Sequence, residues 1–184
     1  DSFSCNGKME ISNRFFHCWK NGGHGTMNLA KSLSESCDVY FYELALKVGI
    51  ERINKMATKL GLGIKHDVPM SAITKGLMPS REWKLNNREQ EWLVGDTVNA
   101  SIGQGYVLSS PLQLAVMAAR LASGKKVNPI LTKSINGQNI HNLKNIEDLD
   151  IDKSYLKIIR KALFQASNDR RGTAYGSRII DDAY

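Results

Sequence analysis

Four side chains near the start of the sequence are of types that bind a metal ion together. Cys5, Cys18 and Cys37 are the chain's three cysteines, and His17 directly precedes Cys18. Three thiolates and one imidazole make up the ligand set of a structural zinc site. Residues 1–25 contain several glycines and little regular patterning, and a bound metal can take the place of a core in such a segment. The residue types therefore predict a zinc site at these four positions.

The spacing of these residues leaves the state of the cysteines open. Cys5 and Cys18 are too far apart in the sequence to form the tight Cys-x2-Cys turn of many zinc sites. In an extended strand, adjacent His17 and Cys18 would point to opposite faces, so both can bind one ion only if the chain turns there. His24 is then the reserve ligand. Free buried thiols are the alternative to a bound metal.

A second pattern, Ser36-Cys37-Asp38, could take part in proton transfer. A serine hydroxyl both donates and accepts hydrogen bonds, so Ser36 can pass a proton between two lysines across a small cleft. Asp38 can hold the junction through backbone hydrogen bonds or contact an amide of a substrate. Taken alone, the short pattern favours a simpler interpretation, in which both residues cap a helix that begins near Val39.

Apolar spacing and capping signals predict a mainly helical chain. Helical spacing begins at Met27, is interrupted at 34–38 and resumes to Val48, and Asp38 is the expected cap of the second helix. Further helices are expected at 51–60, after Ser80, at 111–123 and at 152–167. Strands are expected to be few: 126–135, followed by an Asn136-Gly137 hairpin turn, and a short extended run at 178–180.

The expected helix at 111–123 is apolar on nearly all sides. Ser110 and Pro111 form its start signal and Gly124 its end signal. Only Gln113 and Arg120 interrupt the apolar residues, and they fall on one stripe. A helix of this kind is typical of the centre of a domain, where it is packed on several sides.

Length and composition favour a single globular domain. The chain has 184 residues, of which 42% are hydrophobic, which argues against disorder. Its 25 Lys and Arg against 18 Asp and Glu give a net charge of +7, but the basic residues are scattered, so a nucleic-acid partner is not expected. No apolar run is long enough for a membrane span. Because the first residue is Asp1, we expect a processed chain or an excised part of one, with any anchor outside it.

Five separated segments resemble one known family. They are Trp19–Gly25 continued by Ser32–Tyr42, then Met78–Lys84, Gly95–Thr97, Ser101–Tyr106 and Gly172–Ala174. They follow one another in order from about residue 5 to the end. In this combination the chain resembles the penicillin-binding proteins, and among them the class B transpeptidases of the penicillin-binding protein 2 type, which build the cell wall during elongation.

The resemblance implies a partial transpeptidase domain over residues 1–184. The family works with a Ser-x-x-Lys that carries the nucleophile, a Ser-x-Asn or Ser-x-Asp, and a Lys-[Ser/Thr]-Gly. Ser36-Cys37-Asp38 matches the middle motif, whereas Ser123-x-x-Lys126 and Ser154-x-x-Lys157 follow it and are therefore in the wrong order for the first. The first motif is expected before residue 1 and the third after residue 184.

The fold and activity implied by this resemblance are specific. The fold class is α/β (α+β), the mainly helical part of the penicillin-binding and β-lactamase-like fold, without most of its antiparallel sheet. The parent protein would be a serine-type D,D-transpeptidase that cross-links peptidoglycan stem peptides through an acyl-enzyme and is a target of β-lactams. Ser36 and Asp38 would lie in its catalytic cleft. The chain by itself is expected to be inactive.

The resemblance also implies a setting. No cofactor is required for catalysis, the other partners are the cell-wall elongation machinery, and the location is the periplasmic face of the bacterial inner membrane, reached through an N-terminal anchor outside this chain. In that oxidising compartment a Cys5–Cys18 disulfide rivals zinc. Some family members carry metal-ligand residues in this region, which favours zinc.

One alternative belongs to a different class: a stand-alone zinc-binding or protein-interaction module. Such a module would cover the apolar helix at 111–123 with its own elements. A fragment would leave apolar surface exposed.

Overall fold

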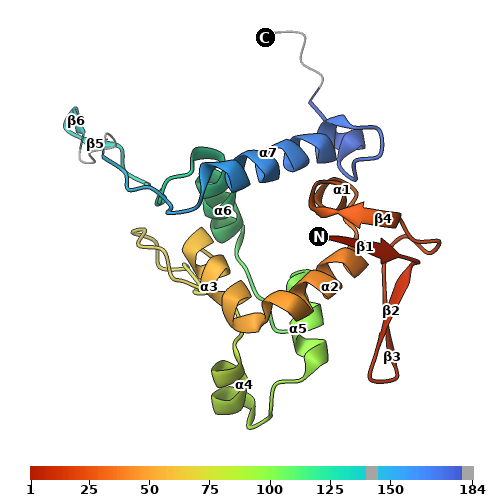
Figure 1. Cartoon of the computed structure of the whole chain (residues 1–184). Helices are drawn as coiled ribbons and strands as arrows, with labels where there is room; N and C mark the ends of the chain where they lie inside the picture. The colour runs from red at the N-terminus through yellow and green to blue at the C-terminus, as the bar shows by residue number, and fades with distance from the viewer. Residues whose placement is uncertain (140–144, 180–184) are drawn as a thin grey trace. The chain divides into compact units, whose positions relative to one another are not determined.

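Figure 1 shows the computed structural model of the chain, which describes residues 1–139 and 145–179. The chain forms two compact units. Unit 1 comprises Asp1–Gly49, Leu93–Ile102 and the chain from Lys157 onward, and unit 2 comprises Ile50–Trp92 and Gly103–Leu156. None of the described helices has the length and apolar character needed to cross a membrane.

Unit 1 begins with two antiparallel strand pairs. β1 (Ser2–Cys5) pairs with β4 (Gly25–Asn28), and β2 (Lys8–Ile11) pairs with β3 (Arg14–His17). From the sequence we expect a mainly irregular segment here with at most a short hairpin, and the pairing of β2 with β3 is such a hairpin. The period-2 signal is weak because each strand has only 4 residues and most of its side chains are exposed.

The helices of unit 1 come from several parts of the chain, and only α1 follows a strand directly. α1 (Leu29–Ser34) is capped by Asn28, whose side chain accepts from Lys31 N. α2 (Asp38–Val48), α5 (Val94–Ser101), the later part of α7 (Lys153–Asn168) and the 3-10 helix η1 (Tyr175–Ser177) complete the unit. Arg178 is extended after η1, and the expected run at 178–180 continues beyond the described residues.

The predicted cap of α2 is wrong. Asp38 is the first residue inside the helix, and Cys37 occupies the N-cap position without a side-chain capping bond. Asp38 instead accepts a hydrogen bond from the backbone N–H of Trp19. A distant segment therefore competes successfully for the carboxylate, which sequence spacing alone does not reveal.

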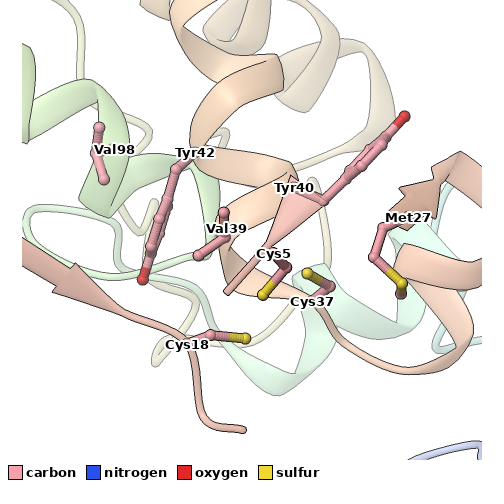
Figure 2. Packing of buried hydrophobic residues seen from close by; sticks show 8 residues of the cluster. All are labelled: Cys5, Cys18, Met27, Cys37, Val39, Tyr40, Tyr42 and Val98. Carbon is pink, nitrogen blue, oxygen red and sulfur yellow. The ribbon is translucent and has the colours of Figure 1, made fainter. Parts of the chain in front are cut away.

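The core of unit 1 gathers around the buried face of α2. Eight buried residues form one cluster, shown in Figure 2: Cys5, Cys18, Met27, Cys37, Val39, Tyr40, Tyr42 and Val98. They come from β1, the loop after β3, β4, α2 and α5. In Figure 2 the three cysteine side chains lie between Tyr42 on one side and Met27 on the other, and because all three are buried the thiols share a largely water-free environment.

Unit 2 contains three complete helices with strong sequence signals. These are α3 (Ile50–Leu60), α4 (Arg81–Arg88) and α6 (Pro111–Ser123). Ser80 caps α4, Ser110 and Gln113 form a capping box at α6, and Gly124 ends α6 in the left-handed conformation. These boundaries confirm the expected starts and stops.

The predicted strand at 126–135 is mostly wrong. Only Ser134–Ile135 is a strand, β5, and it pairs with β6 (Gln138–Asn139) across the expected Asn136-Gly137 turn, where both residues have positive φ. In the residues before β5, the backbone does not pair with another of the described strands. Lys126 N donates to Glu147 O, and Val127 O accepts from the Arg120 side chain, so an alternating pattern does not lead to a ladder.

The predicted burial of α6 is also wrong, because its polar stripe faces inward. Gln113 and Arg120 are buried with Val116, whereas Leu114 is 48% exposed. Arg120 donates through Nε to Val127 O, through Nη1 to Lys59 O and through Nη2 to Asn128 Oδ1. The guanidinium thus joins α3 to the chain after α6.

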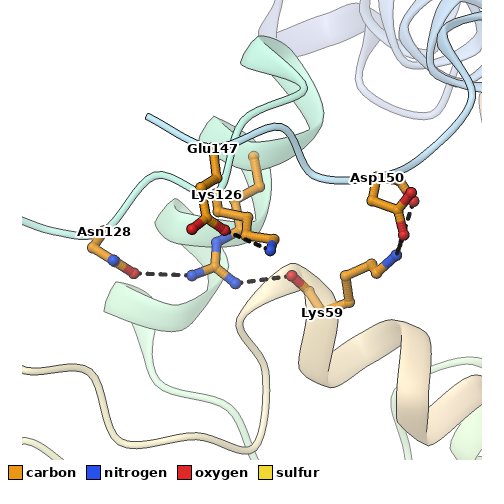
Figure 3. A network of polar contacts seen from close by, with 6 residues as sticks. Lys59, Lys126, Asn128, Glu147 and Asp150 are labelled. Carbon is orange, nitrogen blue, oxygen red and sulfur yellow. Dashed lines mark hydrogen bonds and ion pairs between the residues drawn. The ribbon is translucent and has the colours of Figure 1, made fainter. Parts of the chain in front are cut away.

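Ion pairs at the edge of this network add further links. Figure 3 shows Lys59 reaching Asp150 and Lys126 reaching Glu147. In both pairs the acidic partner is well exposed, so each pair adds little stability compared with the buried guanidinium.

Replacing Gln113 should destabilise unit 2 strongly. Its Nε2 donates to Ile64 O at 2.8 Å and to Lys75 O at 2.7 Å, and its Oε1 accepts from Ser110 N at 3.1 Å. Gln113→Leu keeps the size but removes every one of these bonds, which should lower the free energy of unfolding by about 2–3 kcal/mol. Urea denaturation measures this. The exposed Gln90→Leu is the control, and equal stability of the two variants would contradict the role of Gln113.

Candidate functional site

Ser36 lies at the junction between α1 and α2 in an unusual backbone conformation. Its φ of 52° is in the left-handed region, which is uncommon for residues other than glycine and is often retained at functional sites. Its hydroxyl lies 2.9 Å from the Thr173 hydroxyl. Its carbonyl accepts from the indole Nε1 of Trp19 at 2.8 Å. Both the backbone and the side chain of Ser36 are therefore held by other segments of unit 1.

Asp38 and Trp19 hold the other side of the same junction. Asp38 Oδ2 accepts from the backbone N–H of Trp19 at 2.9 Å. The Trp19 indole also donates to Glu35 O at 3.2 Å, in addition to the Ser36 carbonyl. The carboxylate of Asp38 lies in the first turn of α2, where the positive end of the helix dipole stabilises it.

Ser36 and Asp38 line one open cavity of about 380 Å³. The other lining residues come from α1, α2, α5 and the residue that follows α5: Ser32, Leu33, Phe41, Ser101 and Ile102. The hydroxyl of Ser32 is buried and has no hydrogen-bond partner within the part of the chain that is described. The structure thus brings the two predicted cleft residues to the same hollow, which a common role requires.

The sulfur atoms of the three cysteines converge on one histidine. The ligand atoms of Cys5, Cys18, His24 and Cys37 all lie within 4.8 Å of one another. His24 Nδ1 is 3.7 Å from Cys5 Sγ and 3.5 Å from Cys18 Sγ. All three cysteines are buried free thiols, with no disulfide between Cys5 and Cys18.

Each of these residues is placed by the end of a secondary-structure element. Cys5 ends β1, Cys18 follows β3, His24 precedes β4 and Cys37 is the N-cap of α2. Gly23 allows the loop to close: a Cβ at this position would lie 2.2 Å from the Cys5 carbonyl oxygen, and its φ of +73° also favours glycine.

His17 is not part of the cluster, so the predicted ligand set needs one exchange. His17 ends β3 with an exposed side chain, and its backbone carbonyl accepts from the Tyr42 hydroxyl. Cys18 is buried, as the alternation of a strand requires when His17 points outward. The reserve residue His24 takes the place of His17. The alternation argument was the signal in the sequence for this exchange.

Burial favours the neutral forms of Cys18, Cys37 and His24 in the absence of a cation. It raises the pKa of the Cys37 thiol to about 12 and also raises the pKa of Cys18. Burial likewise lowers the pKa of His24 below its usual value. A neutral imidazole with three thiols suits a divalent cation, because the ion's own charge deprotonates coordinating thiols. His24 Nε2 is buried and has no hydrogen-bond partner among the residues described.

The fold has counterparts among known proteins. A family model described as "Penicillin binding protein transpeptidase domain" matches residues 1–182. The chain belongs to this penicillin-binding protein transpeptidase family. The family resemblance inferred from the five sequence segments and the α/β character of the fold are thereby confirmed.

Individual members of the transpeptidase family are similar over most of the chain. The peptidoglycan D,D-transpeptidase MrdA of Acinetobacter baumannii is 36% identical over 169 residues, which are 89% of this chain and 25% of the relative. The penicillin-binding protein PBP2 of Helicobacter pylori, solved in complex with MreC, is 32% identical with a TM-score of 0.87, covering 99% of this chain and 33% of that one.

A second solved structure, PBP2 of Pseudomonas aeruginosa in complex with WCK 5153, is 34% identical with a TM-score of 0.87. That match covers 96% of this chain and 39% of the solved chain. This chain spans about a quarter of the length of the curated relatives it matches.

Sequence reasoning assigned no role to two residues that contact Ser36. Trp19 and Thr173 each lie in a segment that carries the family resemblance, yet only the structure shows that both make hydrogen bonds to the same serine. The signal in the sequence was their presence in those segments. Their sequence separation from Ser36 gave no indication of contact.

Removing the Asp38 carboxylate should loosen the Trp19 segment. Asp38→Ala loses the hydrogen bond to Trp19 N, which should lower the free energy of unfolding by about 1 kcal/mol. Asp38→Asn keeps an acceptor oxygen and should lose less than half of that amount. Urea denaturation compares the two variants. Equal losses in both would indicate that charge, rather than this hydrogen bond, accounts for the effect.

Proposed function

We propose that this chain is part of a peptidoglycan D,D-transpeptidase in which Ser36 and Asp38 lie in the catalytic cleft. The proposal is supported by family membership and by the names of its curated relatives. The observation that carries it is the position of Ser36: a left-handed residue tied at both its carbonyl and its hydroxyl, beside a cavity that Asp38 also lines. A merely structural turn would not need a fixed hydroxyl beside a cavity.

The reaction would be acyl transfer in two steps. A serine supplied by the first family motif, outside residues 1–184, attacks a stem-peptide carbonyl; a C–O bond forms, the C–N bond breaks, and the serine proton passes to the departing amine. An amine of a second stem peptide then attacks the ester: a new C–N bond forms, the C–O bond breaks, and the proton that the amine loses returns to the serine oxygen. Ser36 relays a proton in these steps because a hydroxyl can accept one hydrogen bond while donating another. β-Lactams would acylate the same serine.

The setting of the parent protein is part of this proposal. A penicillin-binding protein 2 of Helicobacter pylori has been solved with MreC, and a related chain in a peptidoglycan synthase complex. By analogy, the parent protein would work within the cell-wall elongation machinery at the periplasmic face of the inner membrane, held there by a segment outside residues 1–184.

Ser36→Ala should slow acylation of the full-length protein by a labelled penicillin. Loss of a proton-transfer group costs about 10²–10⁴-fold in rate. The Ser36 side chain is exposed, so the thermal unfolding midpoint of the variant should stay close to that of the unsubstituted full-length protein. Ser123→Ala is the matched control, because among the described residues the exposed Ser123 hydroxyl bonds only to nearby backbone at the end of α6, donating to Ala119 O and accepting from Lys125 N.

The chain of residues 1–184 alone should form no stoichiometric adduct in mass spectrometry. A stable adduct at Ser123 or Ser154 would overturn the assignment of the motifs. If the full-length Ser36→Ala variant were acylated as fast as the unsubstituted protein, Ser36 would have no role in relaying a proton. A full-length protein that is never acylated would favour the stand-alone binding module.

We also propose that Cys5, Cys18, His24 and Cys37 hold a structural zinc ion. The support is a set of three sulfurs and one nitrogen within mutual reach of a single ion, with the three cysteines buried and His24 Nδ1 turned toward the sulfurs of Cys5 and Cys18. A bound zinc ion would cross-link β1, the loop after β3 and the start of α2. No catalytic step depends on it.

Replacing His24 and His17 one at a time tests which of the two binds the zinc ion. His24→Ala should remove one ligand and weaken zinc binding at least tenfold, whereas His17→Ala, on the exposed end of β3, should retain the parent affinity. Competition with a chromophoric chelator measures the affinity. Parent protein purified without chelator should carry close to one zinc per chain. Less than about a tenth of an equivalent, with thiols that titrate freely, would refute the site.

A further inference from the structure

We propose that Thr173 is a positioning residue that fixes the hydroxyl of Ser36 for proton transfer. The inference rests on the function proposed above for Ser36 and adds a residue from a different part of the chain. Thr173 lies in the loop of residues 169–174 that follows α7, and its Oγ1 is 2.9 Å from Ser36 Oγ.

The loop contacts three successive residues of the α1–α2 junction. Thr173 N donates to Ser34 O at 3.1 Å, and the Thr173 hydroxyl meets that of Ser36. Between them, Arg171 Nη2 lies 3.3 Å from Glu35 Oε1, a carboxylate whose side chain is only 10% exposed. One backbone bond, one ion pair and one hydroxyl pair therefore align the two segments residue by residue.

The loop itself is built tightly onto the end of α7. Ala174 N donates to Ala166 O, and Gly172 N donates to Asp169 O, both at 2.9 Å. A Cβ at Gly172 would lie 2.2 Å from Ala166 O, so only glycine allows this close approach. Thr173 therefore presents its hydroxyl from a fixed backbone rather than from a loose loop.

A fixed partner matters because a serine hydroxyl has three staggered positions to choose from. Trp19 fixes the Ser36 carbonyl but leaves its side chain free to rotate. The Thr173 hydroxyl selects one position, and its own β-branched side chain is stiff at χ1. Since a hydroxyl can donate or accept, Thr173 keeps its bond to Ser36 whether Ser36 has just received a proton or just passed one on.

The exposure of this pair makes the proposal testable. Ser36 and Thr173 are both exposed, so loss of their mutual bond should hardly change stability. Its effect on rate can therefore be measured without an unfolding artefact. A structural role for the loop would instead depend on Gly172, Ala174 and the Arg171–Glu35 pair, which a substitution at Thr173 leaves in place.

The experiment uses the full-length protein and a labelled penicillin, with the acylation rate constant separated from the dissociation constant of the initial complex. Thr173→Val should lower the rate constant about 10–100-fold with little change in that dissociation constant. Thr173→Ser restores the hydroxyl and should return the rate to within about threefold of the parent. Thr58→Val, at an exposed threonine of α3, is the matched control. The melting midpoints of all variants should agree within about 2 °C.

Crystal structures of the variants give a second readout that does not need activity. Ser36 Oγ should keep a single position against residue 173 in the parent and in Thr173→Ser, and should move or spread over several positions in Thr173→Val. An unchanged Ser36 position or a parent-like acylation rate in Thr173→Val would overturn the proposal, as would failure of Thr173→Ser to restore the rate. A parent protein that is not acylated at all would refute the proposed function, and the position of Ser36 Oγ would still decide the positioning role.

Discussion

The left-handed turn at Ser36 is the constraint on which the rest of unit 1 depends. The chain passes from α1 to α2 within a few residues, and this turn sends neighbouring side chains in different directions. Cys37 points into the buried sulfur cluster, Ser36 remains exposed beside the cavity, and Asp38 reaches Trp19. Non-glycine residues keep such a conformation only where their surroundings determine it, and here Trp19 and Thr173 do so from opposite ends of the chain.

Local signals predicted the local structure of this chain well. Ser80, Ser110 and Gly124 mark helix ends because capping depends on residues within one turn of each other. The failures share a different cause. Asp38 resembles a cap in sequence, but a backbone N–H from a distant loop takes its carboxylate. For the candidate metal site, residue types were sufficient to find the three cysteines, whereas the choice between His17 and His24 depended on which face of β3 turned inward.

The burial of α6 shows how a long-range contact can reverse a hydrophobic pattern. From the sequence of the helix alone, we expect its many apolar residues to be buried and its two polar residues to lie at the edge of the core. In unit 2 the polar pair is buried instead, because Gln113 and Arg120 donate hydrogen bonds to backbone carbonyls of loop residues and of the last turn of α3. Apolar residues such as Leu114 are consequently exposed.

Trp19 gives unit 1 an intrinsic optical probe. Its indole N–H bonds to the Ser36 carbonyl, and its ring lies edge-on to the His24 imidazole with centroids 5.4 Å apart. The other two tryptophans, Trp83 and Trp92, belong to unit 2. A change in ligation of His24 or in the backbone of Ser36 therefore alters the surroundings of a single fluorophore, so the emission of one side chain reports on the sulfur cluster and on the cleft together.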